Sequence, residues 1–304
     1  MPFKTEEVKK IPILTSVSPG FKIAYLFLFL FIGLFISSVF ARLILMIPWI
    51  NSESELTIVY AGLISQSVFA IAIPAYLIVA WTNPKPASYF KLKHDNNLPV
   101  KMFFALLVFL VSYMFTSLLG QWNKGFALPE SLKNIEEFLR SAEDAALETT
   151  NLLLSVDSIA LLLLNIVVIA GFAAVSEEMF FRGALQQFIS EKFKNKHVTV
   201  WIAALIFSLV HFQFYGFLPR LFLGALLGYL YVYTRNLWVP IFFHFINNAS
   251  VIVVHFYWRD TEFYKSIDEA TINSSTIIMG LVSLILTVLL FIRYKRRNLM
   301  TMRD

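Results

Sequence analysis

Long runs of apolar residues, separated by short polar stretches, dominate the pattern of this chain. Seven of these runs carry no charge over about the 20 residues that a helix needs to cross the hydrocarbon core of a membrane. An eighth, shorter run lies between Arg220 and Arg235. The pattern predicts eight transmembrane helices, at Ile23–Ala41, Leu56–Trp81, Met102–Trp122, Ser158–Ser176, Val198–Leu218, Leu221–Thr234, Asn236–Trp258 and Thr271–Ile292.

Composition supports an all-α polytopic membrane protein. Of the 304 residues, 58% are hydrophobic and only 15% are charged, whereas soluble domains are about one quarter charged. We find no internal repeat, and therefore expect a cytoplasmic segment (1–22), a single membrane domain (23–292) and a basic cytoplasmic tail (293–304). The first apolar run does not resemble a cleaved signal peptide, because it is too long and lacks a small-residue cleavage site.

The distribution of basic residues predicts the orientation. With eight helices and the N-terminus inside, 17 of the 25 Lys and Arg residues lie in cytoplasmic segments, seven lie outside and Arg182 lies within a helix. An excess of basic residues in short loops marks the cytoplasmic side. Both termini are thus predicted to be cytoplasmic, in what is best interpreted as a bacterial inner membrane, and the basic tail indicates contact with anionic lipid instead of nucleic acid.

Two further patterns concern packing. The segment 128–140 has apolar residues at helical spacing and predicts an amphipathic helix on the outer surface. Gly224 and Gly228 are four residues apart, a spacing that allows membrane helices to approach closely.

Polar and ionisable residues interrupt three of the apolar runs. They are Glu177, Glu178 and Arg182 in "SEEMFFR", His211 in "FSLVHF", and His244 and Asn248 in "FFHFINNAS". A rise of about 1.5 Å per residue places Glu177, His211 and Asn248 roughly 20 Å from the same membrane surface. Ionisable groups at that depth are costly and commonly functional. We therefore expect them to form one polar site near the middle of the membrane.

Helical spacing separates the roles of the two glutamates. Glu178 and Arg182 are four residues apart, with the acid first, which favours an ion pair within one helix. Glu177 is rotated by about 100° and needs a different partner. His244 and Asn248 are also four apart and share a face. A carboxylate, an imidazole and a His/Asn pair suit general-base catalysis and oxyanion stabilisation.

The motifs "EEMFFR", "FSLVH" and "HFINN" resemble the EExxxR, FxxxH and HxxxN/D motifs of the CAAX-prenyl-protease and bacteriocin-processing (CPBP, or Abi) family of intramembrane proteases. The resemblance covers roughly residues 155–255. It implies that Glu177, assisted by His211, activates water for hydrolysis of a peptide bond. It also implies that His244 and Asn248 stabilise the oxyanion while Glu178 and Arg182 organise the site. The implied substrate is a membrane-associated protein or peptide.

Other functions remain open at this stage. A non-catalytic immunity or regulatory protein would share the fold, and a transporter would also carry polar groups at mid-membrane. Zinc bound by Glu177, His211 and His244 is one means of activating water. We favour a metal-free glutamate and histidine pair, because the HExxH spacing is absent and a metal would occupy His244. A carboxylate in an apolar site also becomes a better base near neutral pH.

Overall fold

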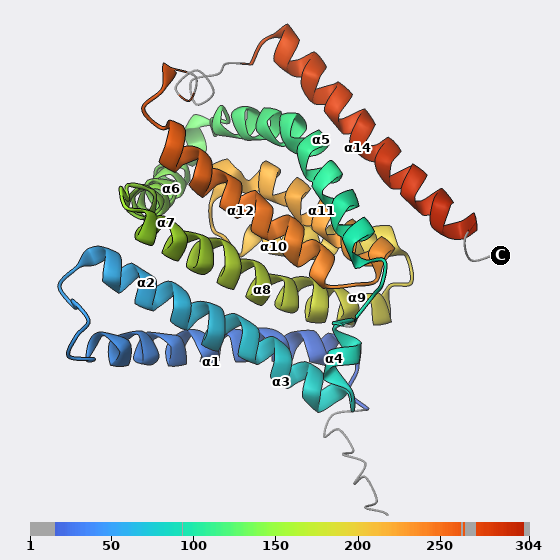
Figure 1. Cartoon of the computed structure of the whole chain (residues 1–304), viewed down its shortest axis with the longest axis horizontal. Helices are drawn as coiled ribbons and strands as arrows, with labels where there is room; N and C mark the ends of the chain where they lie inside the picture. The colour runs from blue at the N-terminus through green and yellow to red at the C-terminus, as the bar shows by residue number, and fades with distance from the viewer. Residues whose placement is uncertain (1–15, 93, 263, 265–271, 301–304) are drawn as a thin grey trace, which may run out of the picture.

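The computed structural model describes residues 16–92, 94–262, 264 and 272–300, which are helical and contain no strand (Figure 1). Within the described residues, seven long or composite helical segments form most of the bundle, and shorter elements connect them. The elements are α1 (Pro19–Leu45), α2 (Glu55–Ser65), η1 (Gln66–Ala72), α3 (Ile73–Thr82), α4 (Pro86–Tyr89), α5 (Leu98–Lys124), η2 (Glu130–Leu132), α6 (Lys133–Leu154), α7 (Ile159–Asn165), η3 (Ile166–Phe172), α8 (Ala173–Glu178), η4 (Met179–Leu185), α9 (Gln186–Lys192), α10 (Lys196–Leu209), η5 (Phe214–Gly216), α11 (Phe217–Thr234), α12 (Trp238–Trp258) and α14 (Ser274–Met300).

The predicted class is confirmed: the protein is an all-helical, polytopic membrane protein. Seven helical segments of the described chain are long and apolar enough to cross a membrane. The run predicted at 198–218 differs, because its helix α10 has 14 residues and ends at Leu209. At about 1.5 Å per residue, α10 is roughly 21 Å long, shorter than the hydrocarbon core of about 30 Å. A helix of that length is too short to cross the hydrocarbon core by itself.

The helices with the candidate polar residues occupy the middle of the bundle. In Figure 1, the continuous helical segment from α7 to α9 lies between the α1–α3 layer and a group formed by α10, α11 and α12, with α5 and α14 beyond it. The segment 159–192 includes two π-helical stretches, η3 and η4. Such stretches are rare and often occur at functional sites. The stretch η4 is buried from Phe180 to Leu185, whereas Leu163 and Val167, nearer the start of the segment, are 57% and 53% exposed.

Close contacts at glycines hold these layers together. A Cβ atom at Gly33 of α1 would lie 2.3 Å from the carbonyl oxygen of Phe69 in η1. Likewise, a Cβ atom at Gly224 of α11 would lie 3.1 Å from the Cα of Ala204 in α10. The prediction of close packing at Gly224 is thus confirmed, and the approach brings the Gly224 carbonyl within reach of the middle helix.

Helix α6 lies across one end of the bundle, where Figure 1 shows it nearly end-on. The predicted amphipathic helix is present, but it runs over Lys133–Leu154 instead of 128–140. Phe138 is 72% exposed and Leu147 is 48% exposed. Apolar side chains exposed beside charged ones suit a helix at a membrane–water interface.

Polar contacts join three elements at the opposite end of the bundle. The Lys22 ammonium of α1 lies 2.7 Å from a Glu191 oxygen of α9, and the Tyr89 hydroxyl of α4 donates to the other oxygen at 3.0 Å. Lys22 and Glu191 are separated by 169 residues, so this ion pair fixes the first helix against the middle segment. Burial is the main reason that the pKa of Tyr89 is raised.

The predicted orientation can be tested with reporter fusions. Fusions at Asn195 and Asn298 should report the cytoplasm, and a fusion at Ser141 in α6 should report the outside, because basic residues are concentrated at the first two positions. Paired alkaline phosphatase and fluorescent-protein reporters give opposite signals on the two sides. A cytoplasmic signal at Ser141 would contradict the proposed orientation.

Candidate active site

Glu177 and Glu178 end helix α8, where the segment changes from α-helical to π-helical hydrogen bonding. They are adjacent, but their surroundings differ. Glu178 is fully buried, whereas the Glu177 side chain is 18% exposed. The predicted separation of the two carboxylates is therefore present in the fold.

Glu178 is the centre of a buried polar network. Its Oε1 atom accepts hydrogen bonds from Arg182 Nη1 at 2.6 Å and from His244 Nδ1 at 2.9 Å. Arg182 and His244 are 1% and 4% exposed. Since a carboxylate accepts only, the His244 Nδ1 atom carries a proton. Helix α12 is thereby joined to the middle segment through Glu178.

Arg182 also contacts the helices on the other side of the network. Its Nη2 atom donates to the Gly224 carbonyl of α11 at 3.0 Å, and its guanidinium lies 4.7 Å from the centre of the Phe207 ring of α10. One turn further along, Gln186 donates to the Gly228 carbonyl at 3.2 Å. The absence of side chains at Gly224 and Gly228 leaves both carbonyls accessible.

Glu177 has no comparable ion pair. Its Oε2 atom is buried and has no hydrogen-bond partner among the described protein groups. The distance from Glu177 Oε2 to Nε2 of His244 is 3.9 Å, which is too long for a hydrogen bond. Glu177 thus retains a carboxylate oxygen that can accept a proton.

The sequence predicted that His211 lies within a helix, but in the structure it does not. It lies two residues beyond the end of α10, and Phe212 after it has a left-handed backbone with φ of 52°. His211 Nδ1 contacts the Phe207 carbonyl oxygen at 2.7 Å. Because that oxygen can only accept, Nδ1 carries the proton and Nε2 remains basic. The Phe207 ring packs against both imidazoles, with centroid distances of 4.9 Å to His211 and 6.2 Å to His244.

Polar side chains from two other helices stabilise the turn that carries His211. Asn123 of α5 donates to the Phe214 carbonyl at 2.9 Å and accepts from the Leu218 amide at 2.6 Å. Glu143 of α6 accepts from the Tyr215 amide at 3.1 Å. Non-helical backbone at membrane depth requires such partners, since lipid offers none. The surface helix α6 consequently helps to position His211.

A second contact from α6 reinforces this arrangement. The Tyr215 hydroxyl lies 3.4 Å from Glu136, and the Arg140 guanidinium lies 4.4 Å from the centre of the Tyr215 ring. The hydrogen bond from Arg140 holds the pKa of the Glu136 carboxyl below its usual range. Glu136 is therefore ionised, and able to accept this bond, throughout the physiological pH range.

Asn248 lies one turn after His244 on α12 but is not bonded to the Glu178 network. Its side-chain amide donates to the Ile169 carbonyl of η3 at 3.3 Å, and its oxygen accepts from Asn247 at 3.1 Å. One N–H of the Asn248 amide is used in the first of these bonds. The structure thus brings together Glu177, Glu178, Arg182 and His244, with His211 joined through Phe207 and Asn248 adjacent on α12.

The donor groups do not form a metal site in this arrangement. Within the described parts of the chain, no group of three or more His, Asp or Glu side chains is placed to hold a metal ion. Glu177, His211 and His244 were the candidate ligands, and they do not fit a three-ligand set here.

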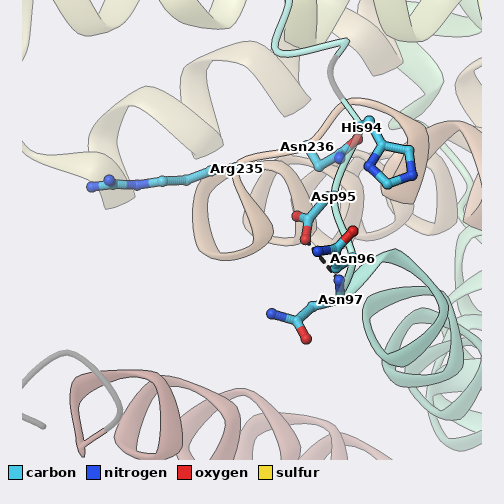
Figure 2. A pocket seen from close by; sticks show the side chains of 6 residues that line it. All are labelled: His94, Asp95, Asn96, Asn97, Arg235 and Asn236. Carbon is cyan, nitrogen blue, oxygen red and sulfur yellow. Dashed lines mark hydrogen bonds between the residues drawn. The ribbon is translucent and has the colours of Figure 1, made fainter.

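A separate polar pocket lies at the end of the bundle opposite α6, and Figure 2 shows it. The loop before α5 and the turn between α11 and α12 line it with His94, Asp95, Asn96, Asn97, Arg235 and Asn236. Lys101 forms an ion pair with Asp95, which keeps the pKa of that carboxyl below its usual range, and donates to the Thr234 carbonyl at 2.9 Å. These contacts connect the loop with the end of α11. The pocket shares no residue with the Glu/His site.

Several structural residues of the site were not identified from sequence. Asn123, Glu143 and Gln186 reach it from other helices or from one turn beyond the motif. Asn165 is fully buried in α7 and accepts from the Tyr60 hydroxyl at 2.6 Å. An asparagine inside the run "ALLLLNIVV" was a visible signal, because membrane helices seldom contain an unpartnered amide.

Comparison with known proteins indicates the same family as the sequence motifs do. Residues 159–250 match the family model described as type II CAAX prenyl endopeptidase Rce1-like. This segment is therefore similar to the family whose motifs the sequence resembles. It extends from the start of α7 into α12, contains all six candidate residues, and lies within the predicted family region 155–255.

Two curated proteins that resemble part of this chain come from Bacillus subtilis (strain 168). The "Uncharacterized protein YpbD" is 36% identical over 89 residues, covering 28% of this chain and 42% of the relative. The "Putative membrane peptidase YdiL" is 30% identical over 107 residues, covering 35% of this chain and 43% of the relative. The matches thus span less than half the length of these relatives. No solved structure gives a significant match to the chain.

Substitutions that remove charge should distinguish the two glutamates. Glu178→Gln or Arg182→Gln leaves one buried charge without its partner, at a cost of about 3–5 kcal/mol. Both variants should therefore melt at lower temperature in detergent. Glu177→Gln should melt as wild type does, because Glu177 forms no ion pair with Arg182.

Arg140→Gln provides the matched control. Glu136 and Arg140 have the same spacing and the same 2.6 Å contact as Glu178 and Arg182, but at an exposed surface. This control should change the melting temperature much less than Arg182→Gln does. Equal destabilisation by Glu177→Gln and Glu178→Gln would contradict the distinction.

Proposed function

We propose that the chain is an intramembrane endopeptidase that hydrolyses a peptide bond in a membrane-associated protein or peptide. The observation that carries this proposal is the difference between the two adjacent glutamates. Glu178 is paired with Arg182 and His244, whereas Glu177 Oε2 has no hydrogen-bond partner among the described protein groups. A polar site of this kind inside an apolar bundle supports chemistry more than it supports stability.

In the proposed reaction, Glu177 accepts a proton from water as the water oxygen attacks the carbonyl carbon of the substrate. His211 assists through its basic Nε2 atom. The carbonyl oxygen becomes an oxyanion, stabilised by His244 and by the second N–H of the Asn248 amide. Glu177 then returns the proton to the leaving nitrogen as the C–N bond breaks. Glu178 and Arg182 hold His244 and the helix in place.

His244 is well placed for this role. Its Nδ1 atom donates to Glu178, which fixes the orientation of the imidazole ring. In the proposed reaction Nε2 also carries a proton, and it faces the Glu177 side of the site. A donor beside the base is what stabilisation of a tetrahedral oxyanion requires.

The family resemblance supports the reaction class, and substrate identity is a matter for experiment. We propose that the protein acts in a bacterial plasma membrane with both termini in the cytoplasm. Comparison of membrane proteins from cells with wild-type and Glu177→Gln chains should reveal a precursor that accumulates in the variant and a fragment that disappears. Loss of general-base catalysis should lower the rate at least 100-fold.

Expression of both chains at equal levels is the control for this comparison. A protein that acts only by binding would keep its cellular function in the Glu177→Gln form. Identical fragment profiles in both strains would contradict the proposed activity.

We further propose that water activation needs no metal. Treatment of the purified protein with a chelator should leave cleavage of the identified precursor unchanged, since the proposed proton transfers involve only side chains. Elemental analysis of the same preparation gives the metal content. Stoichiometric zinc, whose removal stops cleavage and whose return restores it, would refute the metal-free mechanism.

A further inference from the structure

Arg220 has a position that the proposed reaction does not use. It lies in the first turn of α11, nine residues after His211. Its guanidinium donates to both the backbone carbonyl and the side-chain oxygen of Gln213, which belongs to the same turn as His211. The two bonds fix the guanidinium to the turn that carries His211, within range of an electrostatic interaction with Glu177 and His211.

Gly216 provides the space for this guanidinium. A Cβ atom at Gly216 would lie 2.3 Å from Nη1 of Arg220 and 2.9 Å from Cζ. The backbone of Gly216 has φ of −109°, which other residues also adopt. The backbone conformation of residue 216 does not require glycine. Glycine is needed there because a side chain would displace the Arg220 guanidinium.

Among the described residues, Arg220 has no ion-pair partner. Three of the described arginines are not fully exposed: Arg182, Arg220 and Arg259. Arg182 is bonded to Glu178 and Arg259 to Asp157, but the partner of Arg220 is the neutral Gln213. A partly buried arginine is costly without an anion. Arg220 interacts electrostatically with Glu177, Glu143 and His211, and none of the described carboxylates forms an ion pair with it.

We propose that Arg220 binds a carboxylate of the substrate and so selects substrates with an acidic group near the scissile bond. A planar guanidinium with fixed donors matches a carboxylate in two parallel hydrogen bonds. The carboxylate belongs either to a C-terminus or to an Asp or Glu side chain. This inference rests on the proposed function, because it assigns the substrate class to the same site.

Peptide binding to an inactive full-length chain tests the inference. The protein is Glu177→Gln in lipid nanodiscs, with and without Arg220→Gln. The probes are fluorescent octapeptides of leucine and alanine in two pairs. One pair compares a free C-terminus with a C-terminal amide, and the other compares an internal Asp with an internal Asn in amidated peptides.

The acidic member of at least one pair should bind about ten-fold or more tightly than its neutral counterpart, which corresponds to about 1.4 kcal/mol. Arg220→Gln should abolish this preference, and Arg42→Gln, which removes an exposed arginine of α1, should preserve it. The pair that shows the preference identifies the source of the carboxylate. Equal affinities within each pair, no measurable binding of any probe, or a preference that survives Arg220→Gln would overturn the proposal.

Two further variants exclude a folding defect as the cause. Gly216→Ala keeps the charge but displaces the guanidinium, so it should weaken the preference. Arg220→Lys should retain part of it, because an ammonium lacks the planar pair of donors. If Arg220 only held the His211 turn in place, the acidic and neutral peptides would lose affinity equally, which would also overturn the proposal.

Cleavage assays separate this inference from the proposed function. A carboxylate preference that depends on Arg220, together with fragment profiles unaffected by Glu177→Gln, would show an anion site in a protein that is not a protease. Glu177-dependent cleavage together with an absent preference would show a protease in which Arg220 does not select the substrate.

Discussion

The cost of placing charge inside an apolar bundle is the constraint on which this structure depends. Glu178 and Arg182 are almost completely buried, and each is stable there only because the other neutralises it. Glu178 also accepts a hydrogen bond from His244, and Arg182 donates one to the Gly224 carbonyl. One ion pair within a helix thus determines how three helices meet.

This constraint also explains why two adjacent carboxylates can serve different purposes. Successive residues of a helix point in directions about 100° apart, so the same turn presents one acid to the buried network and the other to a more open side. Glu178 binds Arg182 and His244, whereas Glu177 Oε2 has no hydrogen-bond partner among the described protein groups. A single carboxylate could not both neutralise Arg182 and accept a proton during catalysis.

The short helix α10 imposes a second requirement. Since α10 is too short to cross the hydrocarbon core, the non-helical backbone of the turn after it needs protein partners, and Asn123, Glu143 and Ser208 supply them. The same turn carries His211, Gln213 and Phe212, whose left-handed backbone reverses the chain direction. A helix at the membrane surface, α6, is thereby connected to the centre of the candidate active site. The family segment 159–250 contains neither α6 nor Asn123, so the site extends beyond it.

The amino-acid sequence by itself determined the membrane class, the approximate helices and the six candidate residues. The length of an apolar run indicates whether a helix can cross a membrane. A charged residue inside such a run is easily recognised, and its burial costs free energy. The pairing of Glu178 with Arg182 also followed from local spacing, since both residues lie on one helix.

Only the tertiary structure decided how residues from different helices combine. The contact of His244 with Glu178 joins residues 66 positions apart, and that of Asn123 with Phe214 joins residues 91 apart. The helical periodicity of a sequence does not predict contacts between residues so far apart in the chain, because these contacts depend on how neighbouring helices pack and rotate. The early end of α10, the length of α6 and the bonds of Arg220 to the turn of His211 have the same origin: each depends on partners that lie elsewhere in the chain.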